Sequence, residues 1–164
     1  MNSPILFATL LFCALLSPSG SSFAKAGNDK RLPHISVLTL AGDTLMLAEI
    51  CKDKPSFIFF WASWCKICAQ DMKHVFKLQK DFGQQVKVFG IAWKDKPETI
   101  EAYFAKRKMA LQSYIDNDGS VFEALGIKQT PTMMIVSENG NVVFSGSASF
   151  RKLRRILKKQ IKRN

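Results

Sequence analysis

The sequence has few of the side chains that bind metal ions. It contains two histidines, His34 and His74, which stand apart from each other and from any cluster of methionines. We expect His34 to precede a strand and His74 to lie within a helix, both as structural or exposed residues. The phenylalanines fit an ordinary hydrophobic core. We therefore predict no metal site and no cofactor.

No strongly apolar segment of transmembrane length is evident. The apolar stretch from Ile5 to Leu16 has about twelve residues, whereas a membrane-spanning helix needs roughly 20. Small residues follow it at Ser22-Phe23-Ala24. We predict that residues 1–24 form a secretory signal peptide, cleaved after Ala24 or Ala26, although no Lys or Arg precedes the apolar stretch. An uncleaved N-terminal anchor is the alternative, and either one implies a periplasmic or otherwise exported protein.

Cysteine is also scarce, with four residues in the chain. Cleavage of the leader would remove Cys13 and leave Cys51, Cys65 and Cys68, an odd number for an exported protein. We interpret Cys51 as a small buried hydrophobe, since free cysteine is among the most buried residue types. A regulatory or metal-binding third thiol is the alternative.

Cys65 and Cys68 form a C-x-x-C sequence that follows an apolar run and opens an amphipathic one. Two cysteines in the first turn of a helix can close a small disulfide ring. The first lies where backbone N–H groups converge, and these groups, with Lys66, favour its thiolate. We therefore expect Cys65 to be the nucleophile and the less exposed Cys68 to resolve the mixed disulfide. The pattern predicts thiol-disulfide exchange.

Strand and helix patterns alternate along a chain long enough for one domain with a substantial core. Residues 57–61 are continuously apolar, which is typical of a strand buried on both faces, and residues 65–82 show helical spacing. The other predicted elements are a hairpin over 35–40 and 44–48, a strand over 86–93, a helix over 97–106, a strand over 111–115, a short helix over 121–125, a hairpin over 132–136 and 142–145, and a final helix.

This order resembles the thioredoxin-like oxidoreductases, with W-A-S-W-C-x-x-C at 61–68 and Thr130-Pro131-Thr132 before the last hairpin. Gly90-Ile91-Ala92-Trp93-Lys94-Asp95, Asp116-x-Asp118-Gly119 and the extra N-terminal hairpin are similar to the exported TlpA, ResA and DsbE group. The resemblance covers roughly residues 33 to 160. It implies an α/β thioredoxin fold over residues 33–164, with three α/β/α layers, a central mixed sheet, an extra N-terminal β-hairpin and a central αβ insertion.

The resemblance also implies which residues meet the substrate. Pro131 is expected to be a cis-proline facing the dithiol, and Thr130 to supply backbone contacts to an extended substrate segment. Trp64, beside Cys65, is expected to shield the dithiol and meet substrate, although packing alone would also suit it.

The resemblance also indicates a candidate proton acceptor for Cys68. Thioredoxin has a buried Asp where this chain has Phe59. ResA-like proteins are similar to this chain in carrying a carboxylate three residues after the second cysteine, and that residue is Asp71 here rather than the family's Glu. Asp71 is our candidate acceptor of the Cys68 proton. An exposed acid favoured by the helix dipole is the alternative.

Positive charge is concentrated at the end of the chain. Residues 151–163 carry eight Lys or Arg and no acid, in a protein of net charge +11. Apolar residues recur there at helical spacing, so we expect a helix that buries one face. The basic residues expected to turn outward are Arg151, Arg154, Arg155, Lys158 and Lys162. A solvated docking helix is the simpler interpretation, and a surface for anionic lipid or an acidic partner is the alternative. The export signal disfavours nucleic acid.

The sequence as a whole predicts an enzyme, an exported thiol-disulfide oxidoreductase that acts on protein thiols. The resemblance implies a reductase kept reduced by a membrane thiol electron donor, as in cytochrome c maturation. Lys66-Ile67 between the cysteines leaves the redox direction open, so a disulfide oxidase or isomerase is one alternative. Another is a copper or zinc carrier using Cys65 and Cys68, with or without Cys51, although a closed structural zinc site needs four ligands.

Overall fold

A computed structural model describes residues 31–163 of the chain, so the leader expected over residues 1–24 lies outside the described residues. Within that range the strands belong to one seven-stranded sheet of order β2-β1-β5-β4-β3-β6-β7. The strands are β1 (Ser36–Leu38), β2 (Thr44–Met46), β3 (Ser56–Trp61), β4 (Lys87–Trp93), β5 (Ser113–Asp116), β6 (Thr132–Val136) and β7 (Val142–Gly146). The helices are α1 (Leu47–Ile50), α2 (Lys66–Phe82), α3 (Pro97–Arg107), α4 (Ser120–Ala124) and α5 (Phe150–Ile161).

The centre of the sheet is β3, whose six residues are all buried. It pairs in parallel with β4 and antiparallel with β6. Because side chains alternate along a strand, Phe57, Phe59 and Trp61 enter the core under one sheet face, while Ile58 and Phe60 enter the core under the other. Burial on both faces explains why the strand reads as a continuous apolar run.

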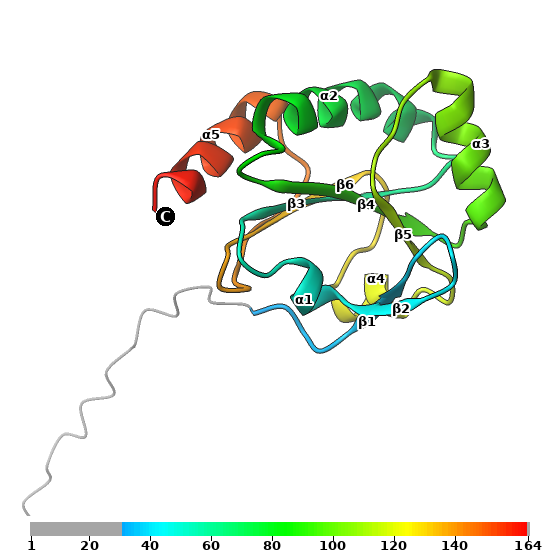
Figure 1. Cartoon of the computed structure of the whole chain (residues 1–164), viewed down its shortest axis with the longest axis horizontal. Coiled ribbons are helices and arrows are strands. Elements are labelled where there is room, and N and C mark those ends of the chain that lie inside the picture. The colour runs from blue at the N-terminus through cyan, green and yellow to red at the C-terminus, as the bar shows by residue number, and fades with distance from the viewer. Residues whose placement is uncertain (1–30, 164) are drawn as a thin grey trace, which may run out of the picture.

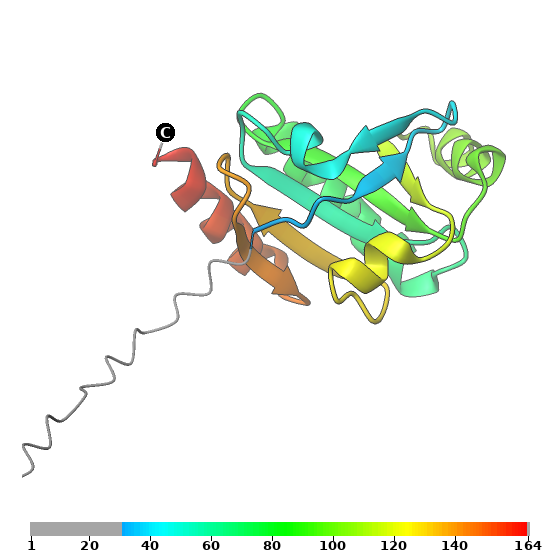
Figure 2. The same ribbon diagram turned by 90° about the horizontal axis from the view of Figure 1, so that it is seen from below.

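Helices cover both faces of this sheet (Figure 1). Helices α2, α3 and α5 lie on one face, and the short helices α1 and α4 lie on the other, as the view from below also shows (Figure 2). The predicted three-layer α/β/α architecture with a mixed central sheet and an N-terminal hairpin is therefore confirmed. No helix between residues 31 and 163 is long and apolar enough to cross a membrane.

Several element boundaries differ from the prediction by one or two residues, and two of these differences have a clear structural cause. The expected strand 44–48 ends at Met46, and Leu47 begins α1. Leu47 is fully buried and its N–H bonds the Ile35 carbonyl at 2.9 Å, so the chain turns inward to bury this side chain. The strand expected over 111–115 is displaced to end at Asp116, whose carboxylate accepts the N–H groups of Gly119 and Phe122 at 3.0 and 2.9 Å. That carboxylate thereby helps to start α4.

Helix α5 packs on the sheet through Leu153 and Leu157, both fully buried. Arg154, which was expected to turn outward, is half-buried. Its guanidinium pairs with the carboxylate of Asp81 at the end of α2 and lies 5.1 Å from the centre of the Phe82 ring. Arginine has a long apolar stem, so it can cover such a ring while its charged head meets an acid. Arg154 therefore joins α5 to α2.

Candidate active site

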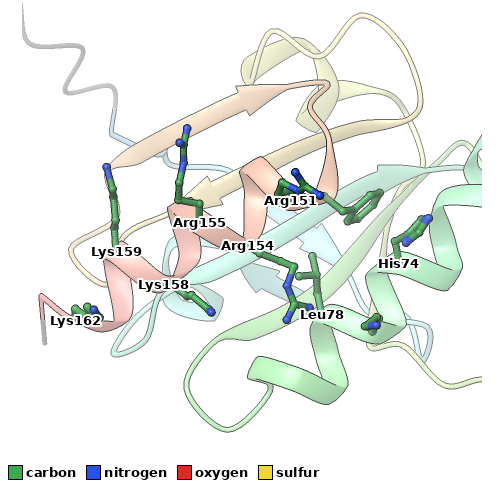
Figure 3. A pocket seen from close by; sticks show the side chains of 10 residues that line it. His74, Leu78, Arg151, Arg154, Arg155, Lys158, Lys159 and Lys162 are labelled. Carbon is green, nitrogen blue, oxygen red and sulfur yellow. The ribbon is translucent and has the colours of Figure 1, made fainter.

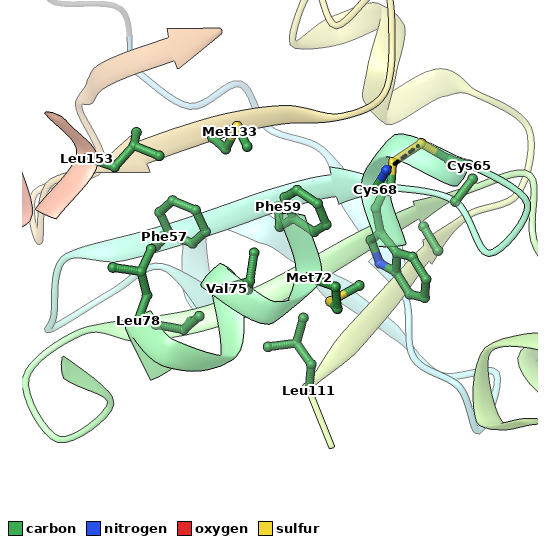
Figure 4. Packing of buried hydrophobic residues seen from close by; sticks show 14 of the residues in the cluster. Phe57, Phe59, Cys65, Cys68, Met72, Val75, Leu78, Leu111, Met133 and Leu153 are labelled. Atoms are coloured by element: carbon green, nitrogen blue, oxygen red, sulfur yellow. Dashed lines mark hydrogen bonds between the residues drawn. A yellow bond between two sulfur atoms is a disulfide. The ribbon is translucent and has the colours of Figure 1, made fainter. Parts of the chain in front are cut away.

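The two cysteines of the C-x-x-C sequence lie where β3 passes into α2. Cys65 is the N-cap residue of α2 and forms a disulfide with Cys68, with their Cα atoms 5.2 Å apart. The backbone N–H of Cys68 also donates to the Cys65 Sγ at 3.1 Å (Figure 4). The first sulfur therefore occupies the position at which a helix N-terminus presents unsatisfied N–H groups to an anion.

The two sulfurs differ in access to solvent. Cys65 is 9% exposed and Cys68 is fully buried. Both belong to the core that also contains Phe59 and Met72, which lie beneath the disulfide in Figure 4. The dithiol thus has one slightly exposed cysteine, one fully buried cysteine and an apolar floor. An incoming thiol or disulfide can reach Cys65 more readily than Cys68.

A buried carboxylate holds the loop that precedes the dithiol. Asp95, just beyond the end of β4, accepts the backbone N–H of Ser63 at 2.6 Å and its hydroxyl at 2.7 Å. Asp95 is itself buried. Charge-assisted hydrogen bonds of this kind are stronger than neutral ones. The pair therefore fixes the loop two residues before Cys65.

An apolar surface borders the accessible sulfur. Trp64 and Ile67 are 59% and 61% exposed, which is unusual for side chains of their size. The Trp64 ring lies 6.0 Å from the Trp93 ring, which in turn stacks on Phe122 at 5.4 Å. Trp64 is therefore supported from behind while one face remains open to a partner.

The segment before β6 lies near the same end of the sheet. The peptide bond between Thr130 and Pro131 is cis. Thr132 pairs with Phe60 in the register of β6 with β3, so Pro131 precedes β6 beside the end of β3 from which the dithiol loop departs. The hydroxyl of Thr132 donates to the Gln129 carbonyl at 2.8 Å and braces this turn. The cis isomer that the family resemblance implied for Pro131 is therefore present. The contacts of Thr130 and Pro131 with substrate stay predictions.

Asp71 lies in the second turn of α2, three residues after Cys68, and is partly buried. Burial raises the pKa of the Asp71 carboxyl above its ordinary value, and the charge of His74 lowers it by less. A carboxyl group with a raised pKa is a stronger base once ionised. This property suits a proton acceptor, and the catalytic role of Asp71 stays a prediction.

Cys51 lies in the core between the sheet and the short helices α1 and α4. It is fully buried among residues under the opposite sheet face from the dithiol. Burial raises the pKa of the Cys51 thiol to about 11, against smaller lowering effects from Ser56 and Lys87. The sheet therefore separates Cys51 from Cys65 and Cys68, which argues against a three-thiolate metal site. Residues 31–163 contain no group of three or more His, Cys, Asp or Glu placed to hold a metal ion.

Comparison with known proteins supports the chemistry that this geometry allows. Residues 29–145, more than half of the chain, match the AhpC/TSA family. The chain belongs to the AhpC/TSA family. The thiol-disulfide oxidoreductase ResA of Halalkalibacterium halodurans is 26% identical to it over 123 residues, which are 74% of this chain and 68% of that protein.

Solved structures agree with this assignment. The structure of MTB dsbF in its mixed oxidized and reduced forms has a TM-score of 0.66 at 26% identity, covering 77% of this chain and 95% of that one. A thiol:disulfide interchange protein of the thioredoxin family from Chlorobium tepidum TLS has a TM-score of 0.66 at 22% identity, covering 81% and 97%. The thioredoxin-like fold and the similarity to the TlpA, ResA and DsbE group are confirmed, and this AhpC/TSA-family chain is a thiol-disulfide oxidoreductase.

The sequence alone indicated no role in the site for Asp95 or Trp93. Asp95 and Trp93 belong to the motif that carried the resemblance, yet their contacts with Ser63 and Trp64 join segments distant in sequence. An acid two residues after an apolar strand was the available signal for Asp95. Its partner could be identified only from the fold.

Replacing Asp95 should destabilise the oxidoreductase more than replacing Ser63. Asp95→Ala removes the acceptor of both hydrogen bonds and should lower the free energy of unfolding by about 3–6 kcal/mol, since bonds to charged groups contribute roughly 1.5–3 kcal/mol each. Ser63→Ala keeps the backbone bond and should cost about half as much. Urea unfolding of both variants measures the difference. Equal losses would show that the backbone bond contributes nothing.

Proposed function

We propose that this protein is an exported reductase that uses Cys65 and Cys68 to reduce disulfides of other proteins. The observation that carries the proposal is the position of Cys65: it caps α2, accepts the Cys68 N–H and is the more exposed sulfur. The similarity to proteins named thiol-disulfide oxidoreductase ResA supports a task like theirs. Cytochrome c maturation is the process that the resemblance suggests.

The reaction begins with the reduced protein. The Cys65 thiolate attacks one sulfur of a substrate disulfide, forms a mixed disulfide and releases the first substrate thiolate. Cys68 then loses its proton and attacks the Cys65 sulfur, which releases the second substrate thiolate. Two electrons pass to the substrate, and the protein is left with the Cys65–Cys68 disulfide. A thiol donor in the membrane would restore the dithiol by the same exchange in reverse.

The surroundings of the dithiol suit an extended protein substrate. Trp64 and Ile67 offer apolar contact beside Cys65. The turn containing Thr130 and Pro131, at the start of β6, offers backbone groups to a segment laid across the site. We assign these residues to substrate binding. The apolar stretch before the domain supports export to the periplasm, with or without cleavage of the leader.

Cys68→Ala in the full chain carrying Cys13→Ser should accumulate mixed disulfides with substrate proteins, because the resolving thiol is gone and the Cys65 adduct persists. Cys65→Ala is the matched control and should trap nothing, since Cys68 is fully buried. Electrophoresis with and without a reductant, after incubation with a disulfide-containing protein, displays the adducts. Trapping by Cys65→Ala at the level of Cys68→Ala would contradict the proposed order of attack.

Asp71→Asn should slow resolution of the mixed disulfide roughly 100-fold near neutral pH, the lower end of what a positioned general base contributes. Asp71→Glu, which keeps a carboxylate, should restore most of the rate. Stopped-flow measurement of the second exchange step against pH tests this, and Asp71→Asn should lose the acidic limb of the profile.

The free energy of unfolding distinguishes a role of Asp71 as proton acceptor from a purely structural role. Because the pKa of Asp71 is raised in the fold, the folded protein binds the proton more tightly than the unfolded chain. The associated stability is present at low pH and is lost as the pH rises through the folded pKa. Asp71→Asn should therefore not destabilise the protein at neutral pH. A stability loss with an unchanged rate profile would indicate a helix-capping acid instead.

A further inference from the structure

A groove of about 920 Å³ lies between α2 and α5, away from the dithiol. Its apolar floor includes Leu78 and Phe150, and the Phe150 ring stacks on His74 at 4.7 Å. Figure 3 shows Arg155 and Lys159 directed to one side of α5, and Arg154 directed toward Leu78. We call this region the basic groove. Its cationic residues are Lys77, Arg151, Arg154, Arg155, Lys158, Lys159 and Lys162.

The positive charge of the basic groove is almost uncompensated. Within residues 31–163, none of the residues that line the groove is an acid. Asp81 forms an ion pair with Arg154 and also feels the charge of Lys77. The side chains of Arg151, Arg155, Lys158 and Lys159 are exposed. Such a cluster of like charges raises the free energy of the isolated fold and lowers that of a complex with an anionic surface. The family match ends at residue 145, before α5 begins.

The basic groove and the start of the described chain lie toward the end of the molecule remote from the dithiol. Strand β3 runs toward the dithiol and β6 runs away from it, so the turn between β6 and β7 lies at the far end. Arg31 pairs with Asn141 of that turn. Asn141, Gln160 and Arg163 line one hollow, which places the end of α5 beside the point where the chain enters the domain.

We propose that the basic groove docks this protein on a membrane surface rich in anionic phospholipid. The cations project to both sides of α5, which suits a broad anionic plane better than one narrow peptide. The apolar stretch of residues 5–16 precedes Arg31, where the described part of the chain begins close to the end of α5. Lys and Arg near an anionic bilayer gain electrostatic attraction to it, and this attraction falls off within a Debye length.

Docking in this way leaves the dithiol facing away from the lipid. Helix α2 has 17 residues and is therefore about 25 Å long, with Cys65 at one end and the groove beside its second half. Substrates in solution could reach Cys65 while the basic groove is occupied. A membrane donor would have to present its thiols well above the bilayer surface. Lipid binding should be the same for the oxidised and reduced protein.

Chemical footprinting of the full chain tests which face meets the lipid. Vesicles of equal parts phosphatidylglycerol and phosphatidylcholine should protect Lys77, Lys158 and Lys159 from acetylation, whereas Lys66 and Lys94 near the dithiol should stay reactive. Phosphatidylcholine vesicles should leave Lys77 and Lys158 reactive, even if the N-terminal apolar stretch inserts. Added salt should abolish the protection of these groove lysines.

A matched pair of triple variants tests the groove itself. Lys158→Gln, Lys159→Gln and Lys162→Gln together should weaken binding to the anionic vesicles roughly 100-fold and remove the protection of Lys77. Lys106→Gln, Lys108→Gln and Lys128→Gln remove equal charge from exposed positions outside the groove and should change binding much less.

Four results would overturn the proposal. An equal loss of vesicle binding in the two triple variants would show that only the net charge of the protein matters. Equal protection of the groove lysines by neutral vesicles would show that the charge of the lipid headgroups does not matter. Stronger protection by poly-glutamate than by anionic vesicles, at equal negative charge, would indicate an acidic protein partner. Protection by inorganic phosphate at matched ionic strength would indicate a site for a free anion.

Discussion

Burial of β3 on both faces is the constraint on which the rest of this structure depends. Each side chain from Phe57 to Trp61 must have an apolar neighbour, so the strand requires helices above and below. Its buried backbone N–H and C=O groups require a flanking strand on either edge, and β4 and β6 supply them. The strand ends at Trp61, and α2 begins five residues later. That junction places Cys65 at a helix N-terminus, on the outer margin of the core, where it keeps 9% exposure. The chemistry of the dithiol thus follows from where a fully buried strand stops.

The molecule separates its tasks between two ends. At one end, the Asp95 carboxylate holds Ser63, Trp93 supports Trp64, and the core closes over Cys68 while Cys65 stays accessible. Toward the other end, α5 carries unpaired cations next to the point where the described chain begins. The same helix, α2, contributes to both, since its first turn holds the disulfide and its second half lines the basic groove. The proposed docking on lipid and the redox exchange would therefore use different surfaces.

Local sequence patterns predicted most of the fold, because apolar spacing and turn residues report directly on strands, helices and hairpins. The dithiol, its helix and both hairpins were identified in this way. The same patterns gave no sign of α1, because its first residues, Leu47 and Ala48, follow directly on β2 and were predicted to continue that strand. Contacts between distant segments were also missed, among them Asp95 with Ser63 and Arg154 with Asp81. The isomer of Pro131 came only from a family resemblance, since an X-Pro bond in sequence does not reveal it.

The reduction potential of the Cys65–Cys68 couple tests the central claim most directly. The full chain carrying Cys13→Ser would be equilibrated with glutathione and dithiothreitol buffers, with tryptophan fluorescence following Trp64 beside the disulfide and Cys65→Ser as the control without a transition. A reductase should have a potential near that of thioredoxin, about −270 mV. A value near that of DsbA, about −120 mV, would mean that the protein accepts electrons from its substrates, and the account of it as a reductase would be wrong.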